Sequence, residues 1–344
     1  MVPRSGRSRV SKTDRMLVTG ASGLVGSHVV AAARAQGIPV LALVRGTSDT
    51  SLLDEWGVET IAGDMAEGES LQEVVSGVSL IVHTAAKVGD WGPVEEYRDV
   101  NVRGLENLLE AALATGSLKR FVHISSLGVY EARDHYGTDE SEKPNATGID
   151  GYTFSKFEAE QLIERYIQEK NLPAVVLRPG FIYGPRDRTV LPKLLERIRN
   201  KGFKFLGSGE QLMNNTYVGN LVDAIFLALE SKQAVGQIYN ITDPALVSKR
   251  EFVSTIARLA GYDVPTKSVP MPVARGLAKV LEKLWRLRGK QEAPLLSGAR
   301  IKFLGLNLDF CIDKAKRELN YRPAVEFADG MQQTIESFKE NGLV

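Results

Sequence analysis

The sequence is short of cysteine, of long apolar runs and of excess charge of either sign. Cys311 is the single cysteine in 344 residues, so no disulfide can form within one chain, and we expect a reducing, cytoplasmic environment. No run of about 18 apolar residues occurs, which argues against a transmembrane span. The 43 basic and 42 acidic residues leave a formal net charge of +1, so nothing draws the whole protein toward nucleic acid.

Clustered metal ligands are also lacking. The four histidines, His28, His83, His123 and His135, are not spaced as ligand pairs, so we predict no metal site. Residues 1–14 are basic and contain no apolar stretch of the kind that a secretory signal needs. We expect a flexible basic tail there.

From Met16 onward, short apolar runs alternate with longer helical patterns. Several of these runs are apolar at every position, as in strands that helices cover on both faces. This rhythm predicts an α/β fold with a Rossmann-like, doubly wound parallel sheet. The expected strands lie near 16–20, 39–45, 59–64, 79–86, 120–125 and 174–178, and the long helices at 94–115 and 152–169.

After residue 183 the rhythm loosens, and the stretch GPRDRT is typical of a turn-rich loop. We expect a helix at 191–200 and a short strand at 204–206. A helix at 220–231 and a strand at 237–241 then return to the core, and residues beyond about 248 are mostly helical.

One late helix, at 273–288, is strongly patterned. Its apolar positions have the spacing of core or pocket cover, namely Val273, Leu277, Val280, Leu281, Leu284 and Leu287. Its basic residues favour a solvated outer face, with peripheral membrane contact as the open alternative, namely Arg275, Lys279, Lys283, Arg286, Arg288 and Lys290.

The first strand runs directly into a glycine-rich turn, TGASGLVG, and a helix follows at once. Gly20 permits the tight turn, Gly23 lets backbone amides approach a pyrophosphate, and Gly26 allows close packing of helix on strand. In this context the pattern predicts dinucleotide binding, with a merely structural turn as the alternative. The expected cofactor contacts in the turn are Gly20, Ser22, Gly23, Leu24, Val25 and Gly26.

The chain is longer than a typical compact domain, which suggests two parts. We predict an NAD(P)-binding domain over 15–183, rejoined by about 217–245. A smaller, mostly helical substrate-binding portion is expected over 184–216 and 246–344.

Cofactor choice depends on the end of the second strand. NAD-binding domains place an acidic residue there, whereas this sequence has Arg45, which can pair with a 2′-phosphate. The sequence therefore favours NADP(H), and NAD(H) stays possible because Arg45 could equally be a solvated strand-end residue. After the third strand, Asp64 and Met65 are expected near the adenine, unless Asp64 simply caps the next turn.

Tyr152 and Lys156 open a predicted helix, and their spacing puts both side chains on one face. Ketone reduction needs a proton donor, and a neighbouring cation is expected to lower the pKa of the tyrosine toward the working range. The pair alone would also suit an ordinary amphipathic face. Ser126, at the carboxyl end of a predicted strand, strengthens the catalytic interpretation because it can hydrogen-bond the substrate oxygen; Ser125 is expected only to cap the strand.

Taken together, the segments TGASGLVG, HTAAKV, NVRGLENLLEAA, HISSLGVY, YTFSK and LRPGFIYGP resemble an extended short-chain dehydrogenase/reductase of the NAD-dependent epimerase/dehydratase superfamily. The resemblance covers nearly the whole chain after Asp14. It implies Tyr152 as proton donor, Lys156 as its activator, Ser126 as carbonyl orienter and Asn101 as a helix-kinking, water-holding residue. It further implies cofactor contacts at Thr84, Ala85, Ala86, Lys87 and Pro179, and a homodimer formed through the helices at 94–115 and 152–169.

Within that superfamily, the stretch HTAAKVGDWGPVEEYRDVNVRG is most similar to the branch of 3β-hydroxysteroid dehydrogenases, dihydroflavonol reductases and 2-alkyl-3-oxoalkanoate reductases. The branch implies a small apolar ketone or alcohol as substrate, with Trp91 and Pro93 in a loop beside the cofactor.

Two other classes are weighed. A nucleotide-sugar epimerase or dehydratase is disfavoured by Arg45, by Leu127-Gly128 in place of Asp-Glu, and by the lack of an arginine in 213–218. Lys201, Lys204 or Arg186 could still supply a clamp for a diphosphate. A non-catalytic NADP sensor is disfavoured because serine, tyrosine and lysine are all present.

Overall fold

The computed structural model describes residues 10–11, 13–145, 150–290 and 292–344. The predicted tail at 1–14 therefore lies largely outside the described residues. Among them, no helix is both long and apolar enough to cross a membrane.

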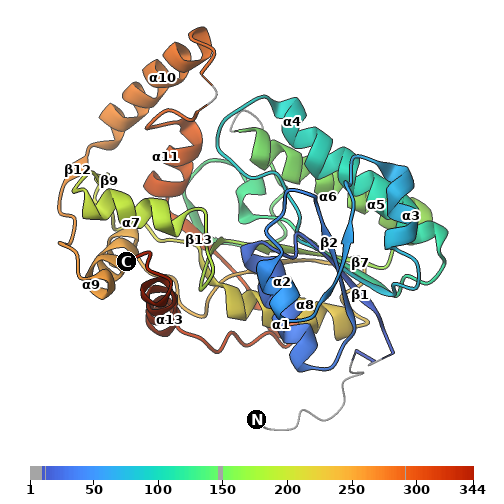
Figure 1. Ribbon diagram of the computed structural model, residues 1–344. Helices are drawn as coiled ribbons and strands as arrows, with labels where there is room; N and C mark the ends of the chain where they lie inside the picture. The colour runs from blue at the N-terminus through green and yellow to red at the C-terminus, as the bar shows by residue number, and fades with distance from the viewer. Residues whose placement is uncertain (1–9, 12, 146–149, 291) are drawn as a thin grey trace.

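A seven-stranded sheet forms the centre of the molecule (Figure 1). The strand order is β11-β7-β5-β4-β1-β2-β3, and every neighbouring pair is parallel. The chain reverses its direction of travel across the sheet between β1 and β4, which is the place where open α/β sheets bind ligands. The strands are β1 (Met16–Thr19), β2 (Val40–Val44), β3 (Glu59–Ala62), β4 (Leu80–His83), β5 (Arg120–Ile124), β7 (Ala174–Pro179) and β11 (Ile238–Ile241).

Helices cover both faces of this sheet, which confirms the doubly wound prediction. Neighbouring strand residues join different cores: Val18 of β1 packs with one set of helices and Leu17 with the other. Because both side-chain directions are buried, the strands are apolar at every position instead of alternately. One face carries α1 (Leu24–Ala35), α2 (Ser51–Glu55) and α8 (Val218–Glu230), and the other carries α3 (Leu71–Val74), α5 (Gly104–Ala114) and α6 (Gly151–Lys170).

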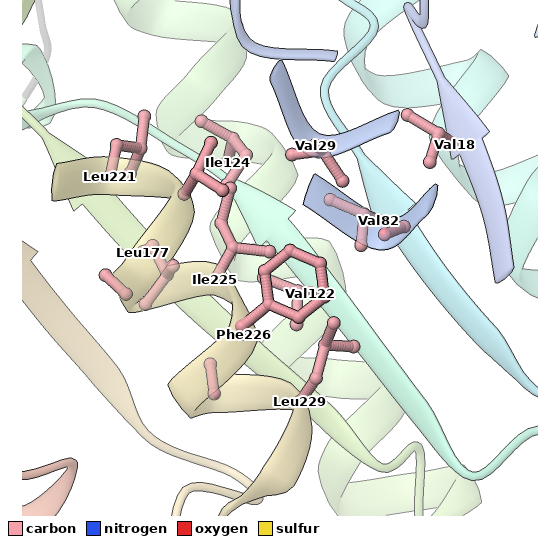
Figure 2. Close-up of a cluster of buried hydrophobic side chains, with 14 of the residues drawn as sticks. Val18, Val29, Val82, Val122, Ile124, Leu177, Leu221, Ile225, Phe226 and Leu229 are labelled. Atoms are coloured by element: carbon pink, nitrogen blue, oxygen red, sulfur yellow. The ribbon is translucent and has the colours of Figure 1, made fainter. Parts of the chain in front are cut away.

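Helix α8 seals the first of these cores. Its Leu221, Ile225 and Leu229 point toward Val122 of β5 and Leu177 of β7 (Figure 2). The predicted helix at 220–231 and strand at 237–241 therefore rejoin the sheet, with β11 at its edge beside β7.

The segment 94–114 is not one regular helix. It consists of α4 (Val94–Arg98), a π-helical turn (Asp99–Arg103) and α5. The prediction of a single helix at 94–115 is corrected by this turn, because Asn101 at its centre bonds to other segments. Such π-helical turns are frequent at functional sites.

Sequence reasoning missed three pairs of very short strands. They are β8 (Phe181–Tyr183) with β10 (Asn215–Tyr217), β9 (Phe205–Leu206) with β12 (Ser268–Val269), and β6 (His135–Thr138) with β13 (Leu308–Phe310). Of these strands, β9 alone was expected. The others were missed because runs of two to four residues carry no readable period.

The remaining elements are α7 (Leu191–Arg199), α9 (Lys249–Ala260), α10 (Met271–Leu287), α11 (Gly298–Gly305), α12 (Asp313–Glu318), α13 (Phe327–Glu340) and the 3₁₀ turns at Gly68–Ser70 and Leu127–Val129.

The prediction that α10 uses its apolar positions as core or pocket cover is wrong for five of the six. The five positions 273, 277, 280, 284 and 287 are exposed, and only Leu281 packs into a core, beside the buried Ala274 and Ala278. The helix turns its small residues inward, because alanine allows a closer approach to α11 than a larger side chain would.

Candidate active site

The glycine turn after β1 has the geometry that a bound phosphate group requires. Gly20 has φ of +68°, and a Cβ there would lie 2.8 Å from the Thr84 hydroxyl oxygen and from the Ala85 nitrogen. A Cβ on Gly26 would overlap the Gly20 carbonyl oxygen. The Gly23 amide donates to that same oxygen at 3.0 Å, which closes the turn. Only glycine fits these positions.

Helix α1 begins at Leu24 directly behind this turn. Its N-cap, Gly23, provides no side-chain hydrogen bond, and its first turn contains no acidic residue. The amides of this first turn therefore keep their positive potential for an anion. Ser22, Leu24 and Val25 are half-buried along the same path. The cradle fits a dinucleotide pyrophosphate.

At the predicted adenosine end, Arg45 lies exposed just beyond β2. Its backbone is held in a turn with Ser48, whose hydroxyl accepts from the Arg45 amide at 3.1 Å. Within the described residues the Arg45 guanidinium has no ion pair, so it is available to a 2′-phosphate. The Asp64 carboxylate accepts from the Ala66 amide at 2.9 Å, so it caps the turn, which was the alternative to an adenine contact. Met65 is buried under Gly104 of α5.

The segment 84–87 after β4 runs beside the glycine turn. The Thr84 hydroxyl donates to the Thr19 carbonyl at 2.7 Å, and the Ala85 amide donates to the Thr19 hydroxyl at 3.2 Å. Asn101 fastens the far end of the segment: its side chain accepts from the Lys87 amide at 2.7 Å and donates to the Lys87 carbonyl at 3.0 Å. Ala86 lies half-buried between these anchors.

Asn101 also reaches α6. Its amide donates to the Ser155 hydroxyl at 2.8 Å, and Ser155 in turn donates to the Tyr152 carbonyl at 2.8 Å. The π-helical turn thus ties the predicted cofactor segment to the start of α6. No described contact bears on the water-holding role that the resemblance implies for Asn101.

Ser126, Tyr152 and Lys156 come together at the carboxyl end of β5. The Lys156 ammonium donates to the Ile124 carbonyl at 2.7 Å and is 3% exposed. The Ser126 side chain hydrogen-bonds Tyr152 and also accepts from the Gly128 amide at 3.0 Å. Helix α6 starts at this place because the Asp150 carboxylate caps it, accepting from the Thr153 amide at 2.7 Å.

The protonation of the two groups differs from the sequence-based prediction. Burial raises the pKa of Tyr152 to about 12, with Asp150 adding to the increase and the Ser126 hydrogen bond opposing it. Burial lowers the pKa of Lys156 to about 8, and Glu160 opposes that shift. The expected lowering of the tyrosine pKa is therefore wrong in this structure, because desolvation and the charge of Asp150 both raise it and only the Ser126 hydrogen bond lowers it.

Behind the three residues lies a buried polar network. Arg178 of β7 pairs with Glu160 of α6 at 2.5 Å and donates to the Tyr130 hydroxyl at 2.8 Å. Ser125 donates to Glu160, so the prediction that it only caps its strand is wrong. Pro179 ends β7 and is buried beside β11.

Two further residues lie near the predicted site: Arg186, which the sequence offered only as a possible clamp for a diphosphate, and Lys302, which sequence reasoning missed. Arg186, in the stretch GPRDRT, has φ of +68°, and its guanidinium lies 5.3 Å from the centre of the Trp56 ring. Its Nε is buried without a hydrogen-bond partner, and its charge, together with burial, lowers the pKa of His28 on α1 to about 4. The next arginine, Arg188, reaches Asp49 beyond β2 at 2.6 Å. The loop thus spans from β8 to the predicted adenosine end.

The residue that sequence reasoning missed is Lys302 of α11. Its ammonium donates to the carbonyls of Gly128 and Tyr130 at 2.5 and 2.6 Å, directly after Ser126. Burial lowers the pKa of Lys302 to about 8. No local pattern marks it, since its partners lie more than 170 positions away.

Comparisons with known proteins agree with this geometry. Residues 16–242 match the NAD dependent epimerase/dehydratase family. The 4-hydroxy-2-methyl-3-oxo-4-farnesyl-3,4-dihydroquinoline-1-oxide ketoreductase of Stigmatella aurantiaca is 33% identical over 92% of this chain and 94% of its own. The 2-alkyl-3-oxoalkanoate reductase of Shewanella oneidensis is 30% identical, with coverage of 94% and 86%. The 3beta-hydroxysteroid-dehydrogenase/decarboxylase isoform 1 of Arabidopsis thaliana is 28% identical, with coverage of 96% and 81%.

Among solved structures, the crystal structure of gox2253 has a TM-score of 0.82 and 29% identity, covering 96% of this chain and 99% of that one. The UDP-glucuronic acid 4-epimerase of Bacillus cereus, in complex with NAD, has a TM-score of 0.75 with 23% identity over 95% and 99%, a likeness of fold alone. The protein is an enzyme, a nicotinamide-dependent oxidoreductase that acts on CH–OH groups. The chain belongs to the NAD dependent epimerase/dehydratase family, in the branch with ketoreductases, 2-alkyl-3-oxoalkanoate reductases and 3β-hydroxysteroid dehydrogenases.

Proposed function

We propose that the enzyme interconverts a ketone and a secondary alcohol on an apolar substrate with NADP(H), and that Tyr152 carries the proton. The substrate class comprises steroid-like, flavonoid-like and long-chain β-keto or β-hydroxy compounds. The observation that carries the proposal is the convergence of Ser126, Tyr152 and Lys156 beside the glycine turn.

When bound, the nicotinamide supplies or accepts the hydride. Tyr152 is a neutral phenol at neutral pH because its pKa is raised to about 12, so its proton is available to the oxygen of a ketone undergoing reduction. Ser126, already hydrogen-bonded to Tyr152, is placed to orient that oxygen. Lys156 is fixed to the end of β5 and offers its remaining donors to the cofactor ribose.

The apolar substrate is supported by aromatic residues just beyond the triad. Phe181 follows Gly180 at the end of β7, and its ring lies 4.9 Å from Phe303 of α11 and 5.6 Å from Phe252 of α9. Phe181 and Phe303 are only half-buried, so their faces can meet a ligand. The relatives point the same way, since one is a ketoreductase for a farnesylated quinoline and another a reductase for alkyl-oxoalkanoates.

The choice of NADP(H) is supported by the unpaired Arg45. Arg186 adds a second cation near α1 and Trp56, and because its buried Nε lacks a partner, an anionic cofactor group would relieve its desolvation. NAD(H) is the alternative cofactor.

A nucleotide-sugar epimerase is the alternative function, and structural neighbours of that kind share the fold. The described residues offer few free cations that could bind the diphosphate of such a substrate. Lys201 is exposed and paired with Asp263 at 2.9 Å, and Arg186 lies against Trp56 beside α1. A non-catalytic NADP sensor is disfavoured by the complete triad.

A substrate panel with NADPH, followed by nicotinamide absorbance, tests the proposal. We expect oxidation of NADPH with at least one β-keto acid, ketosteroid or dihydroflavonol. Tyr152→Phe should lower turnover by a factor of at least about 10² while NADPH binding stays unchanged. The matched control is Tyr136→Phe, since Tyr136 is an exposed tyrosine on β6, and it should retain full activity.

Retained turnover in Tyr152→Phe would contradict the mechanism. Inactivity with the whole panel, together with conversion of a sugar nucleotide in the presence of NAD, would replace the proposed function by the alternative.

A further inference from the structure

Helix α10 stands at the edge of the molecule and packs only along one side (Figure 1). Its buried Ala274 and Ala278 and its half-buried Leu281 contact a small core with Leu296 and Ile301. The opposite side of the helix meets no other described element of the fold.

Five large aliphatic side chains lie exposed on that free side. They occupy positions i, i+4, i+7, i+11 and i+14, which form a single narrow stripe about 21 Å long on an α-helix. We call these residues the apolar stripe: Val273 (58% exposed), Leu277 (45%), Val280 (56%), Leu284 (38%) and Leu287 (74%). A stripe of this size on a monomer is unusual and marks an interaction surface.

Basic side chains run alongside the apolar stripe. On a helical projection, Arg275, Lys279, Lys283 and Arg286 share the sector next to it, and all four are exposed. The only acidic residue of α10, Glu282, accepts from the Gly298 amide at 2.7 Å and pairs with Arg286 at 3.8 Å. The free side of α10 therefore combines aliphatic groups with net positive charge, because Arg275, Lys279 and Lys283 form no ion pair within the described residues.

We propose that α10 docks on the surface of a bilayer containing anionic lipid, with the apolar stripe in the acyl boundary and the basic residues among the headgroups. Aliphatic side chains beside lysines and arginines are what binds a helix in the interfacial plane. Each basic residue near an anionic surface adds attraction that salt weakens. No helix among the described residues could span the bilayer, so the contact is peripheral.

A second copy of this chain is a poorer occupant. An isologous dimer across the apolar stripe would bring the basic rows of two copies close to one another. Like charges at such a distance oppose association, whereas lipid phosphates pair with them.

The docked helix adjoins the candidate active site. The Trp91 indole donates to the Lys290 carbonyl at 2.9 Å, and the Arg286 guanidinium lies 5.7 Å from the centre of the Trp91 ring. Asp90 pairs with Arg300 at 2.5 Å. The Trp91 contacts fasten the C-terminal end of α10 to the loop after the predicted cofactor residues 84–87, and the Asp90–Arg300 pair fastens that loop to α11.

Two further exposed apolar residues flank this junction, Val88 (70%) and Leu295 (68%). A docked enzyme would thus present the loop after the predicted cofactor residues 84–87 to the bilayer. Resting on the proposed function, this arrangement lets an apolar substrate enter from the membrane instead of from water.

Vesicle co-sedimentation of the full chain tests docking without any substrate. We expect binding to vesicles of phosphatidylcholine with phosphatidylglycerol, weaker binding to phosphatidylcholine alone, and loss of binding as salt is raised. Leu277→Glu/Leu284→Glu should weaken binding to the anionic vesicles by at least about tenfold, and Lys279→Glu/Lys283→Glu should do so as well.

The matched control is Val235→Glu/Val264→Glu, which places the same two charges at exposed aliphatic positions outside α10 and should bind as the wild type does. Circular dichroism and NADPH binding verify that each variant is folded. Failure of the wild type to bind anionic vesicles overturns the proposal. The proposal is also overturned if light scattering shows that the wild type is a dimer and that only the α10 variants are monomers. A second copy of the chain would then cover the apolar stripe.

Because the vesicle assay needs no ketone, its result is independent of whether the proposed function is correct. Vesicle binding without any ketone reduction would leave docking intact and remove only the substrate route.

Discussion

Lys156 combines burial with a single backbone partner, the Ile124 carbonyl. A lysine with its pKa lowered to about 8 is charged below that pH and neutral above it. Tyr152 stays protonated up to about pH 12 and contributes no ionisation at neutral pH. The pH dependence of ketone reduction should therefore follow the lysine.

We predict that kcat/KM for ketone reduction is level at neutral pH and falls as the pH rises through about 8. A pH profile with NADPH measures it. Lys302 also has a pKa near 8, so Lys156→Arg is the deciding variant: it retains its charge and should lose the falling limb. A limb that persists in Lys156→Arg would assign the ionisation to another group.

Arg45 is the residue on which we expect the choice of cofactor to depend. Without its guanidinium a 2′-phosphate loses its cationic partner, whereas a ribose hydroxyl loses little. Arg45→Ala should raise KM for NADPH by about tenfold or more and leave KM for NADH nearly unchanged. Initial rates with both cofactors measure the shift, with Arg34→Ala, an exposed arginine on α1, as control. Equal effects on the two cofactors would contradict the assignment.

Among the elements, α6 carries the most functional groups. One side presents Tyr152 and Lys156 to β5, Ser155 binds Asn101, and Glu160 one turn later binds Arg178 of β7. The buried ion pair thus holds α6 against β7, and with it the positions of Tyr152 and Lys156 one to two turns earlier in the helix.

Glu160→Gln should lower the free energy of unfolding by about 3–5 kcal/mol, because it leaves Arg178 charged and unpaired in the interior. Urea denaturation at neutral pH measures the change. Glu106→Gln, which breaks an exposed pair with Arg165, is the control and should cost less than about 1 kcal/mol. Similar costs for the two variants would mean that the buried pair does not fix α6.

The helical elements also separate what a sequence can predict from what it cannot. The period of α8 and the unbroken apolar runs of the strands were sufficient to predict these elements, because burial of their faces leaves a repeating pattern in the sequence. The π-helical turn was invisible because its cause, the bonds of Asn101 to Lys87 and Ser155, links segments distant in the chain.

For the whole molecule, Asp243 joins the sheet to β8, β10 and α8, and through Asn220, which donates to the Val325 carbonyl at 2.8 Å, to the C-terminal segment. It follows β11, and its carboxylate accepts from the Tyr217 amide at 2.6 Å, from Asn220 at 2.8 Å, and from Asn215 and the Tyr183 hydroxyl at 2.9 Å. These donors come from β10, α8 and β8.

Asp243→Asn should lower the free energy of unfolding by about 2–4 kcal/mol, because the new amide group faces donors instead of accepting from them. Limited proteolysis should also cut the segment after residue 246 faster. Denaturant titration and a digestion time course provide the measurements. Asp313→Asn, at an exposed aspartate, is the control and should change little. An unchanged digestion pattern in Asp243→Asn would show that the two regions are held together elsewhere.

The sequence by itself determined the parallel sheet, the glycine turn and the placement of Tyr152 and Lys156 on one helix, because each is a local pattern read within a few residues. Tertiary structure alone decided the protonation of those two groups, since desolvation depends on what surrounds them. It also decided the position of Arg186 beside Trp56 and the exposure of α10. Apolar spacing shows that a helix has an apolar face, but only the packing of the whole chain decides whether protein covers it.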